Sequence, residues 1–226
     1  MIVAIIPARK NSKRIKNKNV KNFNKKPMIY WSIKKLKDSK IFDKIIVSSD
    51  SEKILKISRK LNVDICINRP KKLSTSTAIT KDVIIHSINF LKKKNILPKF
   101  VFCVYPCAPF IKIEDLKKAI RIVKFKKDAF ISTVTEYSHP IERSFSLTRN
   151  YRIIDRITKN INSNTQKFQK RFHDSGQFYL STPKVWTQKN HPKNHYGIKL
   201  PTWRSIDIDS IEDWKRAELL SKIIKF

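Results

Sequence analysis

Several cationic side chains follow directly on the first apolar run of the chain. Residues 2–6 are apolar and largely β-branched, and Pro7 ends the run. This pattern predicts a buried strand followed by a turn. The turn carries four cations and two small polar residues, Arg9, Lys10, Lys13, Arg14, Asn11 and Ser12. Backbone N–H groups, guanidinium forks and ammonium groups that converge in one turn suit the oxygens of a polyphosphate. The stretch therefore predicts a phosphate-binding loop; the alternative is that these cations are merely solvated.

Two carboxylates near the other end of the sequence share one side of an extended segment. Asp207 and Asp209 are separated by one residue, so their side chains project together while Ile206 and Ile208 point into the core. Such a pair suits Mg²⁺, which prefers one or two carboxylates completed by water and substrate phosphates. Helix capping by Asp209 or Ser210 is the alternative, but it leaves Asp207 without a role. Together with the basic loop, the pair predicts a metal site.

The elements that must position these groups alternate along the chain. Further buried strands are expected at 44–49, 63–67, 100–105 and 129–135, and helices are expected to begin near residues 27, 51, 80 and 113. This alternation predicts an α/β fold with a mostly parallel sheet covered by helices on both faces.

Ligands of such sheets bind beyond the carboxyl ends of the strands. The polar residues just past these ends are Arg9, Asp50, Arg69 and Tyr105. We therefore expect them to share one cleft. Asp50 has a simpler explanation as well, because Asp50 or Ser51 can cap the helix that follows.

The alternation stops between residues 136 and 172. This stretch is rich in Arg, Asn, Ser and Thr, has no helical period, and contains Phe145, Tyr151 and Ile153 in short β-like runs. We interpret it as an extended arm, inserted into a single domain over 1–226, through which two copies of the chain form a homodimer. Beyond it, 172–180 is expected to be a loop that enters a strand, and a final helix is expected to end near Ile224.

The composition is strongly basic, with a formal net charge of +32. The lysines are spread along the whole chain and, with only two glycines, fit a genome whose codons are biased towards A and T. No nucleic-acid-binding motif is present, so we expect no nucleic-acid partner. The odd count of three cysteines predicts reduced thiols. The sequence shows neither a signal peptide nor a run of about eighteen apolar residues, so we expect a cytoplasmic protein without a membrane partner.

Five ordered stretches together resemble a known enzyme family. They are IPARKNSKRIKNKN at 6–19, RPKKLSTSTA at 69–78, YPCAPF at 105–110, FHDSGQFYLS at 172–181 and SIDIDSIEDWKRAE at 205–218. In these stretches the chain is similar to the cytidylyltransferases that activate nine-carbon sialic-acid-like sugars, and most of all to the branch that acts on pseudaminic acid. The resemblance spans nearly the whole chain.

The resemblance implies the Rossmann-like fold of the nucleotide-diphospho-sugar transferases and a dimer formed through the inserted arm. It also implies the activity, which is Mg²⁺-dependent transfer of CMP from CTP to the anomeric hydroxyl of pseudaminic acid, a nonulosonic acid, with release of pyrophosphate. Within the family, the alternative sugars are N-acetylneuraminic acid and legionaminic acid. An alternative of another class is a basic nucleic-acid-binding protein without catalysis.

The family's functional positions carry over to the matching residues of this sequence. Those implied for nucleotide binding are Ala8, Arg9, Ser12, Lys13, Asn19, Arg69, Ala78 and Thr80. Those implied for catalysis are Arg9, Lys18 and Asp209, and those for the metal are Asp207 and Asp209. Those implied for the sugar are Tyr105, His173, Asp174 and Gln177. Tyr105 stands where sialic-acid synthetases carry Gln, and 173–177 replaces their Arg-Pro-Asn-Gly, so the resemblance favours pseudaminic acid.

Overall fold

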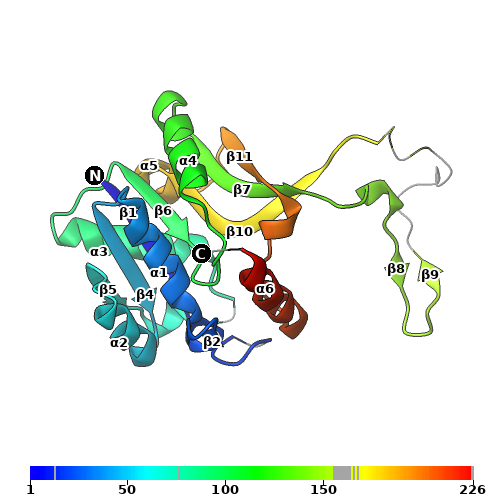
Figure 1. The fold of residues 1–226 in the computed structure, drawn as a ribbon. Coiled ribbons are helices and arrows are strands. Elements are labelled where there is room, and N and C mark those ends of the chain that lie inside the picture. Colours follow the sequence, from blue (N-terminus) through cyan, green and yellow to red (C-terminus); the bar gives the residue numbers. More distant parts are fainter. Residues whose placement is uncertain (13, 76, 155–163, 165, 167, 225–226) are drawn as a thin grey trace.

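The structure, a computed structural model, describes residues 1–226 except 13, 76, 155–163, 165, 167, 225 and 226. The described residues form a central sheet of seven strands in the order β11-β7-β10-β6-β1-β4-β5 (Figure 1). These are β1 (Ile2–Pro7), β4 (Lys44–Ser49), β5 (Ile65–Asn68), β6 (Phe100–Val104), β7 (Phe130–Glu136), β10 (Phe172–Ser181) and β11 (His195–Leu200). In the described part of this sheet, β10 is antiparallel to β6 and β7, and the other pairs are parallel. The mostly parallel sheet expected from the sequence is confirmed.

Apolar runs form the central strands because both faces of the sheet are covered. Val3, Ala4, Ile5 and Ile6 of β1 are completely buried. Successive side chains enter opposite cores, so that Ala4 and Ile6 belong to one hydrophobic cluster and Val3 and Ile5 to another.

Helices cover both cores, as the strand–helix alternation predicts (Figure 1). The first core includes residues of α1 (Met28–Ser39), α2 (Glu52–Lys60) and α4 (Ile113–Phe125). The second includes residues of α3 (Thr80–Lys93) and α5 (Pro183–Thr187). The short helix α5 and the strand β11 are additions that the sequence pattern did not predict.

The last helix, α6 (Ile211–Ile223), packs in a third apolar cluster away from these two cores. Its Trp214 ring meets Phe23 edge to face, with ring centroids 5.5 Å apart. Phe23 belongs to a small hairpin of β2 (Asn22–Phe23) and β3 (Lys26–Pro27) just before α1. This packing brings the segment before α6 next to the loop that follows β1.

A long extension leaves the sheet between the end of β7 at Glu136 and the start of β10 at Phe172 (Figure 1). It contains the single turn η3 (Ile141–Arg143) and a hairpin of β8 (Ser146–Leu147) and β9 (Ile153–Ile154). Its described part exposes several large apolar side chains, Tyr137, Phe145, Leu147, Tyr151, Ile153 and Ile154. The extension occupies the range that the sequence assigned to an inserted arm.

Local capping settles one of the open alternatives. The Ser51 hydroxyl accepts a hydrogen bond from the backbone N–H of Ile54 at 3.5 Å and caps α2. The side chain of Asp50 is directed elsewhere, so the capping explanation of Asp50 is wrong.

The three cysteines are free thiols. In the described ranges, no helix has both the length and the apolar character needed to cross a membrane.

Candidate active site

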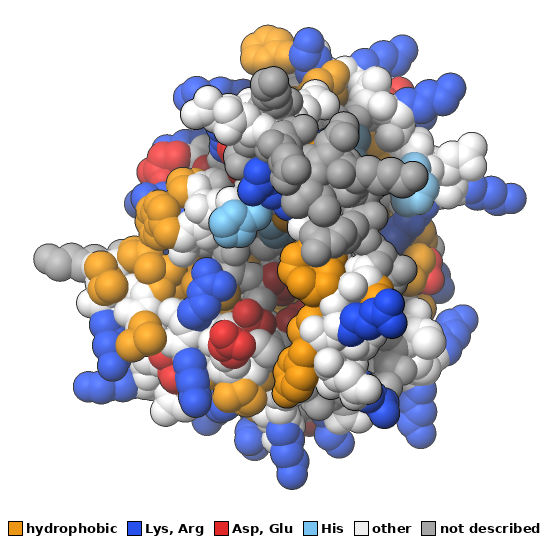
Figure 2. Space-filling view, turned by 90° about the vertical axis from the view of Figure 1, so that its right-hand side faces the viewer, with side chains coloured by type: hydrophobic (Ala, Val, Ile, Leu, Met, Phe, Trp, Pro, Cys, Tyr) orange, Lys and Arg blue, Asp and Glu red, His pale blue; other side chains and the backbone are white. Residues whose placement is uncertain are grey.

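A pocket of about 840 Å³ lies beyond the carboxyl ends of the parallel strands. Eleven of the residues assigned to nucleotide, metal, sugar or catalysis line it: Arg9, Ser12, Lys18, Asn19, Arg69, Ala78, Thr80, Tyr105, Asp174, Asp207 and Asp209. Figure 2 shows acidic side chains gathered in a hollow on one face of the molecule, while Lys and Arg are scattered over that face. The pocket thus joins residues from both ends of the chain.

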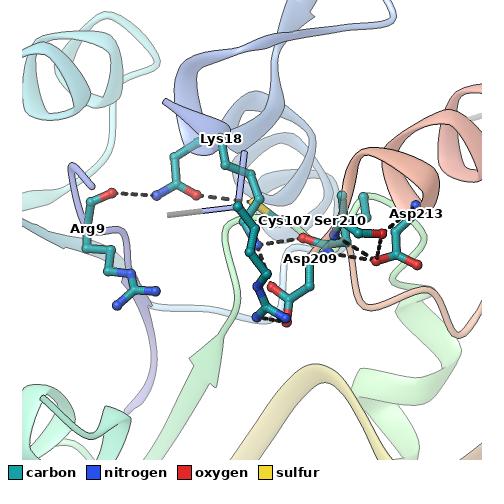
Figure 3. Close-up of polar contacts among 9 residues, drawn as sticks. Arg9, Lys18, Cys107, Asp209, Ser210 and Asp213 are labelled. Carbon is teal, nitrogen blue, oxygen red and sulfur yellow. Dashed lines mark hydrogen bonds and ion pairs between the residues drawn. The ribbon is translucent and has the colours of Figure 1, made fainter. Parts of the chain in front are cut away.

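Lys18 and Arg14 hold Asp209 at one side of the pocket, and Figure 3 shows Lys18 next to Asp209. The Lys18 ammonium donates to Oδ1 of Asp209 at 3.0 Å and to the carbonyl oxygen of Ile208 at 2.6 Å. The Arg14 guanidinium donates to the other carboxylate oxygen of Asp209. Lys18 follows the first loop in the single turn η1 (Lys18–Val20), so the loop and the segment before α6 are bound directly to each other.

A capping box fixes the backbone just after Asp209 (Figure 3). The Ser210 hydroxyl accepts from the N–H of Asp213 at 3.1 Å, and the Asp213 carboxylate accepts from the N–H of Ser210 at 2.8 Å. The same carboxylate accepts from the N–H of Asp209 at 3.1 Å. Ser210 is therefore the cap of α6, and the Asp209 side chain is directed to Lys18 instead. Capping as the explanation of Asp209 is wrong.

Asp207 lies in the same pocket, against the backbone of β10. Gly176 has a φ of +62°, and a Cβ atom at that position would come within 3.2 Å of Cγ of Asp207. Glycine therefore permits both the left-handed turn and the close approach of the carboxylate. Burial, reinforced by the charge of Asp209, raises the pKa of Asp207.

The two aspartates fit a hard divalent cation. Among the described residues, no group of three or more His, Cys, Asp or Glu side chains is placed to hold a metal by itself. Mg²⁺ does not need such a cage, since one or two carboxylates completed by water and phosphate oxygens suffice. Burial and, after it, repulsion from Asp209 raise the pKa of Asp207, and a cation bound between the carboxylates would offset both effects.

Asn19 and Cys107 shape the wall of the pocket near the first loop. The Asn19 side-chain amide donates to the carbonyl oxygen of Arg9 at 2.8 Å, and the Cys107 thiol donates to the Asn19 amide oxygen at 3.2 Å. Arg9 and Asp209 both line the pocket, and Figure 3 shows their side chains on different sides of this part of the molecule. Burial raises the pKa of the Cys107 thiol to about 12, so the thiol stays a neutral donor. Ala8 is fully buried beneath this wall, outside the pocket lining.

Two tyrosines form the opposite wall. The Tyr105 hydroxyl lies 3.1 Å from the Thr80 hydroxyl, and the Tyr179 hydroxyl donates to the Asp174 carboxylate. The two rings meet edge to face at 5.8 Å. Burial raises the pKa of Tyr105 to about 12. A second hollow of about 440 Å³ shares Thr80 and both tyrosines with the main pocket.

Two of the residues assigned to the sugar lie outside the pocket lining. The Gln177 side chain is buried, and its amide donates to the carbonyl oxygen of Arg204 at 2.9 Å. His173 packs against Tyr137 at the base of the extension, with ring centroids 4.7 Å apart. The pairing of β10 with β7 shifts register between Asp174 and Tyr179, which changes the side to which the intervening residues point. Lys13, assigned to the nucleotide, is outside the described residues.

Some pocket residues were not assigned individually to nucleotide, metal or sugar from the sequence. Arg14 was noted only as one of the loop cations, although it pairs with Asp209. Gly176, Tyr179 and Cys107 line the pocket as well. Gly176 carried a usable signal, since the chain has only two glycines.

Comparison with known proteins identifies the family. A family model described as "Cytidylyltransferase" matches residues 3–226, and the chain belongs to this family of nucleotide-transferring enzymes. The chain is 34% identical over 223 residues to a pseudaminic acid cytidylyltransferase of Campylobacter jejuni, covering 98% of this chain and 96% of the relative. It is 25% identical over 236 residues to the CMP-N,N'-diacetyllegionaminic acid synthase of Legionella pneumophila, and the match covers 98% of this chain and 97% of the relative.

Solved structures show the same fold. One of CMP:2-keto-3-deoxy-manno-octonic acid synthetase complexed with CTP superposes with a TM-score of 0.73 at 12% identity and covers 99% of both chains. A 4-diphosphocytidyl-2C-methyl-D-erythritol synthase from Anaerococcus prevotii gives a TM-score of 0.60 at 14% identity, covering 98% of both chains. The nucleotidyltransferase fold expected from the sequence is confirmed.

Proposed function

We propose that this cytidylyltransferase transfers CMP from CTP to the anomeric hydroxyl of pseudaminic acid, with Mg²⁺ as cofactor. The observation that carries the proposal is the meeting of Arg9 and Lys18 with Asp207 and Asp209 around one pocket. Cations that bind a triphosphate and carboxylates that bind a divalent metal are the two parts that phosphoryl transfer needs. The choice of sugar is supported by 34% identity to pseudaminic acid cytidylyltransferases over nearly full length.

In the proposed reaction, the anomeric hydroxyl oxygen attacks the α-phosphorus of CTP in line with the departing group. A new phosphorus–oxygen bond forms to the sugar, the hydroxyl proton passes to solvent, the bond from the α-phosphorus to the oxygen of the β-phosphate breaks, and pyrophosphate leaves. Such a displacement depends on placement and charge stabilisation more than on covalent help. The Arg9 guanidinium binds phosphate oxygens, while Lys18 holds Asp209 in place through its contacts at 3.0 Å and 2.6 Å.

Asp207 and Asp209 would hold the metal. Bound there, Mg²⁺ would supply positive charge that stabilises the phosphate oxygens. The remaining nucleotide contacts are assigned to pocket-lining residues of the segments that follow β1 and β5, namely Ser12, Asn19, Arg69, Ala78 and Thr80. Asn19 acts by fixing the carbonyl of Arg9 as well as by facing the pocket.

The sugar would lie against the wall formed by Tyr105, Tyr179 and Asp174. Their hydroxyl and carboxylate groups offer donors and acceptors, and both phenols also border the second hollow. A polar wall beside an apolar hollow suits a sugar that carries both hydroxyl and acyl substituents. N-acetylneuraminic acid and legionaminic acid are the competing sugars, because the relatives include an N-acylneuraminate cytidylyltransferase and a CMP-N,N'-diacetyllegionaminic acid synthase, at 26% and 25% identity.

The test is pyrophosphate release from purified protein with Mg²⁺, offering all four nucleoside triphosphates against a panel of nonulosonic acids. We expect CTP with pseudaminic acid to give the highest kcat/KM. Legionaminic or N-acetylneuraminic acid at a higher kcat/KM would refute the choice of sugar. Absence of CTP-dependent pyrophosphate release with every sugar would refute the activity itself.

We also propose that the extension forms a homodimer. It exposes a series of large apolar side chains, among them Leu147 at 58% and Tyr151 at 84%, on a two-stranded hairpin that is marginal in isolation. Sedimentation at micromolar concentration should give twice the monomer mass. Replacing Leu147 and Tyr151 together by Lys should yield monomer, with exposed Phe125 of α4 changed to Lys as the matched control. A wild-type monomer at micromolar concentration would count against the dimer.

A further inference from the structure

Asp50 stands directly after β4 and does not cap the helix that follows it. A single oxygen of its carboxylate, Oδ1, accepts two hydrogen bonds. One comes from the backbone N–H of Lys10 at 2.7 Å, and the other from Nη2 of Arg69 at 3.3 Å. The side chain of Asp50 is 18% exposed and that of Arg69 only 4%. This carboxylate therefore joins two segments that border the pocket.

The position of Asp50 extends the order of the sheet into the loops. Strand β4 lies between β1 and β5, and the backbone ladders continue one step past the paired residues. The N–H of Ala8 donates to the carbonyl oxygen of Ser48, and the N–H of Arg69 donates to that of Ser49, both at 2.9 Å. Beyond these last backbone bonds, the Asp50 side chain contacts the loop after β1 and the side chain after β5. The Asp50 side chain thus links the segments that follow β1 and β5, just as β4 links these two strands in the sheet.

The charge of Asp50 also matters for Arg69. Burial lowers the pKa of the Arg69 guanidinium, the charge of Arg9 acts in the same direction, and Asp50 opposes both. Nε of Arg69 is buried and has no hydrogen-bond partner among the described residues. The contact with Asp50 thus holds a guanidinium that retains an unused donor at the wall of the pocket. Without Asp50, the Arg69 guanidinium would lose the anion that opposes its burial and the charge of Arg9.

We propose that Asp50 is a positioning residue for CTP, which fixes the first loop and Arg69 in register so that both can meet the same nucleotide. The inference rests on the proposed function, since it assumes that CTP occupies this pocket. It assigns Asp50 no contact with the reacting atoms. The expected signature is therefore weaker nucleotide binding, with little change in turnover at saturating CTP and in the KM for the sugar.

The experiment compares Asp50→Ala, Asp50→Asn and the control Asp64→Ala. Asn keeps an oxygen that can accept from Lys10, while it removes the charge and replaces the second carboxylate oxygen by an NH₂ group. Oδ2 of Asp64 accepts from the backbone N–H of Ile45 at 2.8 Å, at the opposite end of β4, so its loss removes a comparable bond far from the pocket. Calorimetric titration with CTP and steady-state kinetics are measured for each variant, with thermal unfolding as the check on folding.

We expect Asp50→Ala to raise the Kd and the KM for CTP by about tenfold, as loss of charge-assisted hydrogen bonds predicts. kcat and the KM for the sugar should stay within about threefold, and Asp50→Asn should recover part of the loss. Asp64→Ala should lower the Tm and leave the Kd for CTP unchanged. If Asp50→Ala does not fold, Asp50→Asn provides the test, with an expected rise in the Kd of about threefold.

A wild-type Kd for CTP in a folded Asp50 variant would overturn the proposal, and so would an equal rise in Asp64→Ala. A fall in kcat with unchanged KM for CTP would overturn it as well. The proposed function fails separately: a wild-type protein that binds CTP but transfers CMP to no nonulosonic acid refutes the reaction, while the Kd values still decide the role of Asp50.

Discussion

The ammonium of Lys18 lies 3.0 Å from Oδ1 of Asp209, although 191 residues separate the two in the chain. The Lys18 side chain is 16% exposed, so this pair is shielded more than a surface ion pair, and its second contact is the carbonyl oxygen of Ile208. One compact cation therefore fixes both the side chain and the adjacent backbone of a residue that we assign to metal binding.

Changing Asp209→Asn should lower turnover by about 10²-fold or more, by analogy with the loss of one transition-state electrostatic contact. The amide would keep the size of the side chain but weaken its interactions with Lys18, Arg14 and a metal. Pyrophosphate release with increasing Mg²⁺ is the measurement. Glu212→Gln, an exposed acid of α6, is the matched control and should be silent. Normal Mg²⁺-dependent turnover of Asp209→Asn would refute its role.

Lys18→Met should reduce kcat/KM for CTP by about 10²-fold, because removing one partner leaves Asp209 and the Ile208 carbonyl without their shared donor. Lys18→Arg should restore little of this, since a planar guanidinium cannot place one donor at both 2.6 Å and 3.0 Å contacts. Steady-state kinetics at varied CTP will show this. Full activity of Lys18→Arg would mean that only the positive charge matters.

Tyr105→Phe removes the hydroxyl that lies 3.1 Å from Thr80 and leaves the ring packed against Tyr179. We expect the KM for the sugar to rise by about five- to tenfold, which is the effect of one lost hydrogen bond. The KM for CTP should stay nearly constant. Kinetics with each substrate varied in turn distinguish the two. If only the KM for CTP changed, Tyr105 would contact the nucleotide and not the sugar.

Ser210→Ala breaks the capping box of α6 and should cost about 1 kcal/mol of unfolding free energy. Because Asp213 also accepts from the N–H of Asp209, the variant Asp213→Asn should lower both stability and activity. Urea unfolding followed by circular dichroism gives the free energies. A Ser210→Ala variant as stable as the wild type would show that the cap contributes nothing.

The Cys107 thiol should resist alkylation in the folded protein. With its pKa raised to about 12 by burial, roughly one thiol in 10⁴ is ionised at pH 8, compared with a sizeable share for an ordinary cysteine near 8.5. A raised pKa means that the thiolate fraction keeps increasing about tenfold for each pH unit up to pH 10. Site-resolved mass spectrometry after iodoacetamide treatment measures this, with urea-unfolded protein as the control. A plateau near pH 9 in the folded protein would contradict it.

The sequence revealed the central strands because their residues are apolar on both faces. Ile2–Pro7 and Phe100–Val104 admit few other interpretations. Strand β11 was not predicted: its burial alternates, with Ile198 and Leu200 inside and Lys199 outside, and the run is short. Helix α5 has five residues and begins at a proline, so no helical period could indicate it.

The pocket was predictable where residue type alone determines chemistry. Arg9, Asp207 and Asp209 were predicted from charge and spacing, whereas Lys18 was predicted only from the family resemblance, and all four line the pocket. Gln177 was assigned to the sugar but faces the interior, because its direction depends on the register shift around Gly176. The contacts of Asp50 with Lys10 and Arg69 could not be predicted from the sequence, because they form only when β1, β4 and β5 lie side by side.

The separation of Lys18 from Asp209 has a consequence during synthesis of the protein. A ribosome that has translated Lys18 must still add 191 residues before Asp209 exists. A nascent chain can therefore form its first strands and its basic loop while the acidic half of the pocket is missing. At the site proposed above, nucleotide and metal can therefore assist folding together only after residues 207–209 have been synthesised.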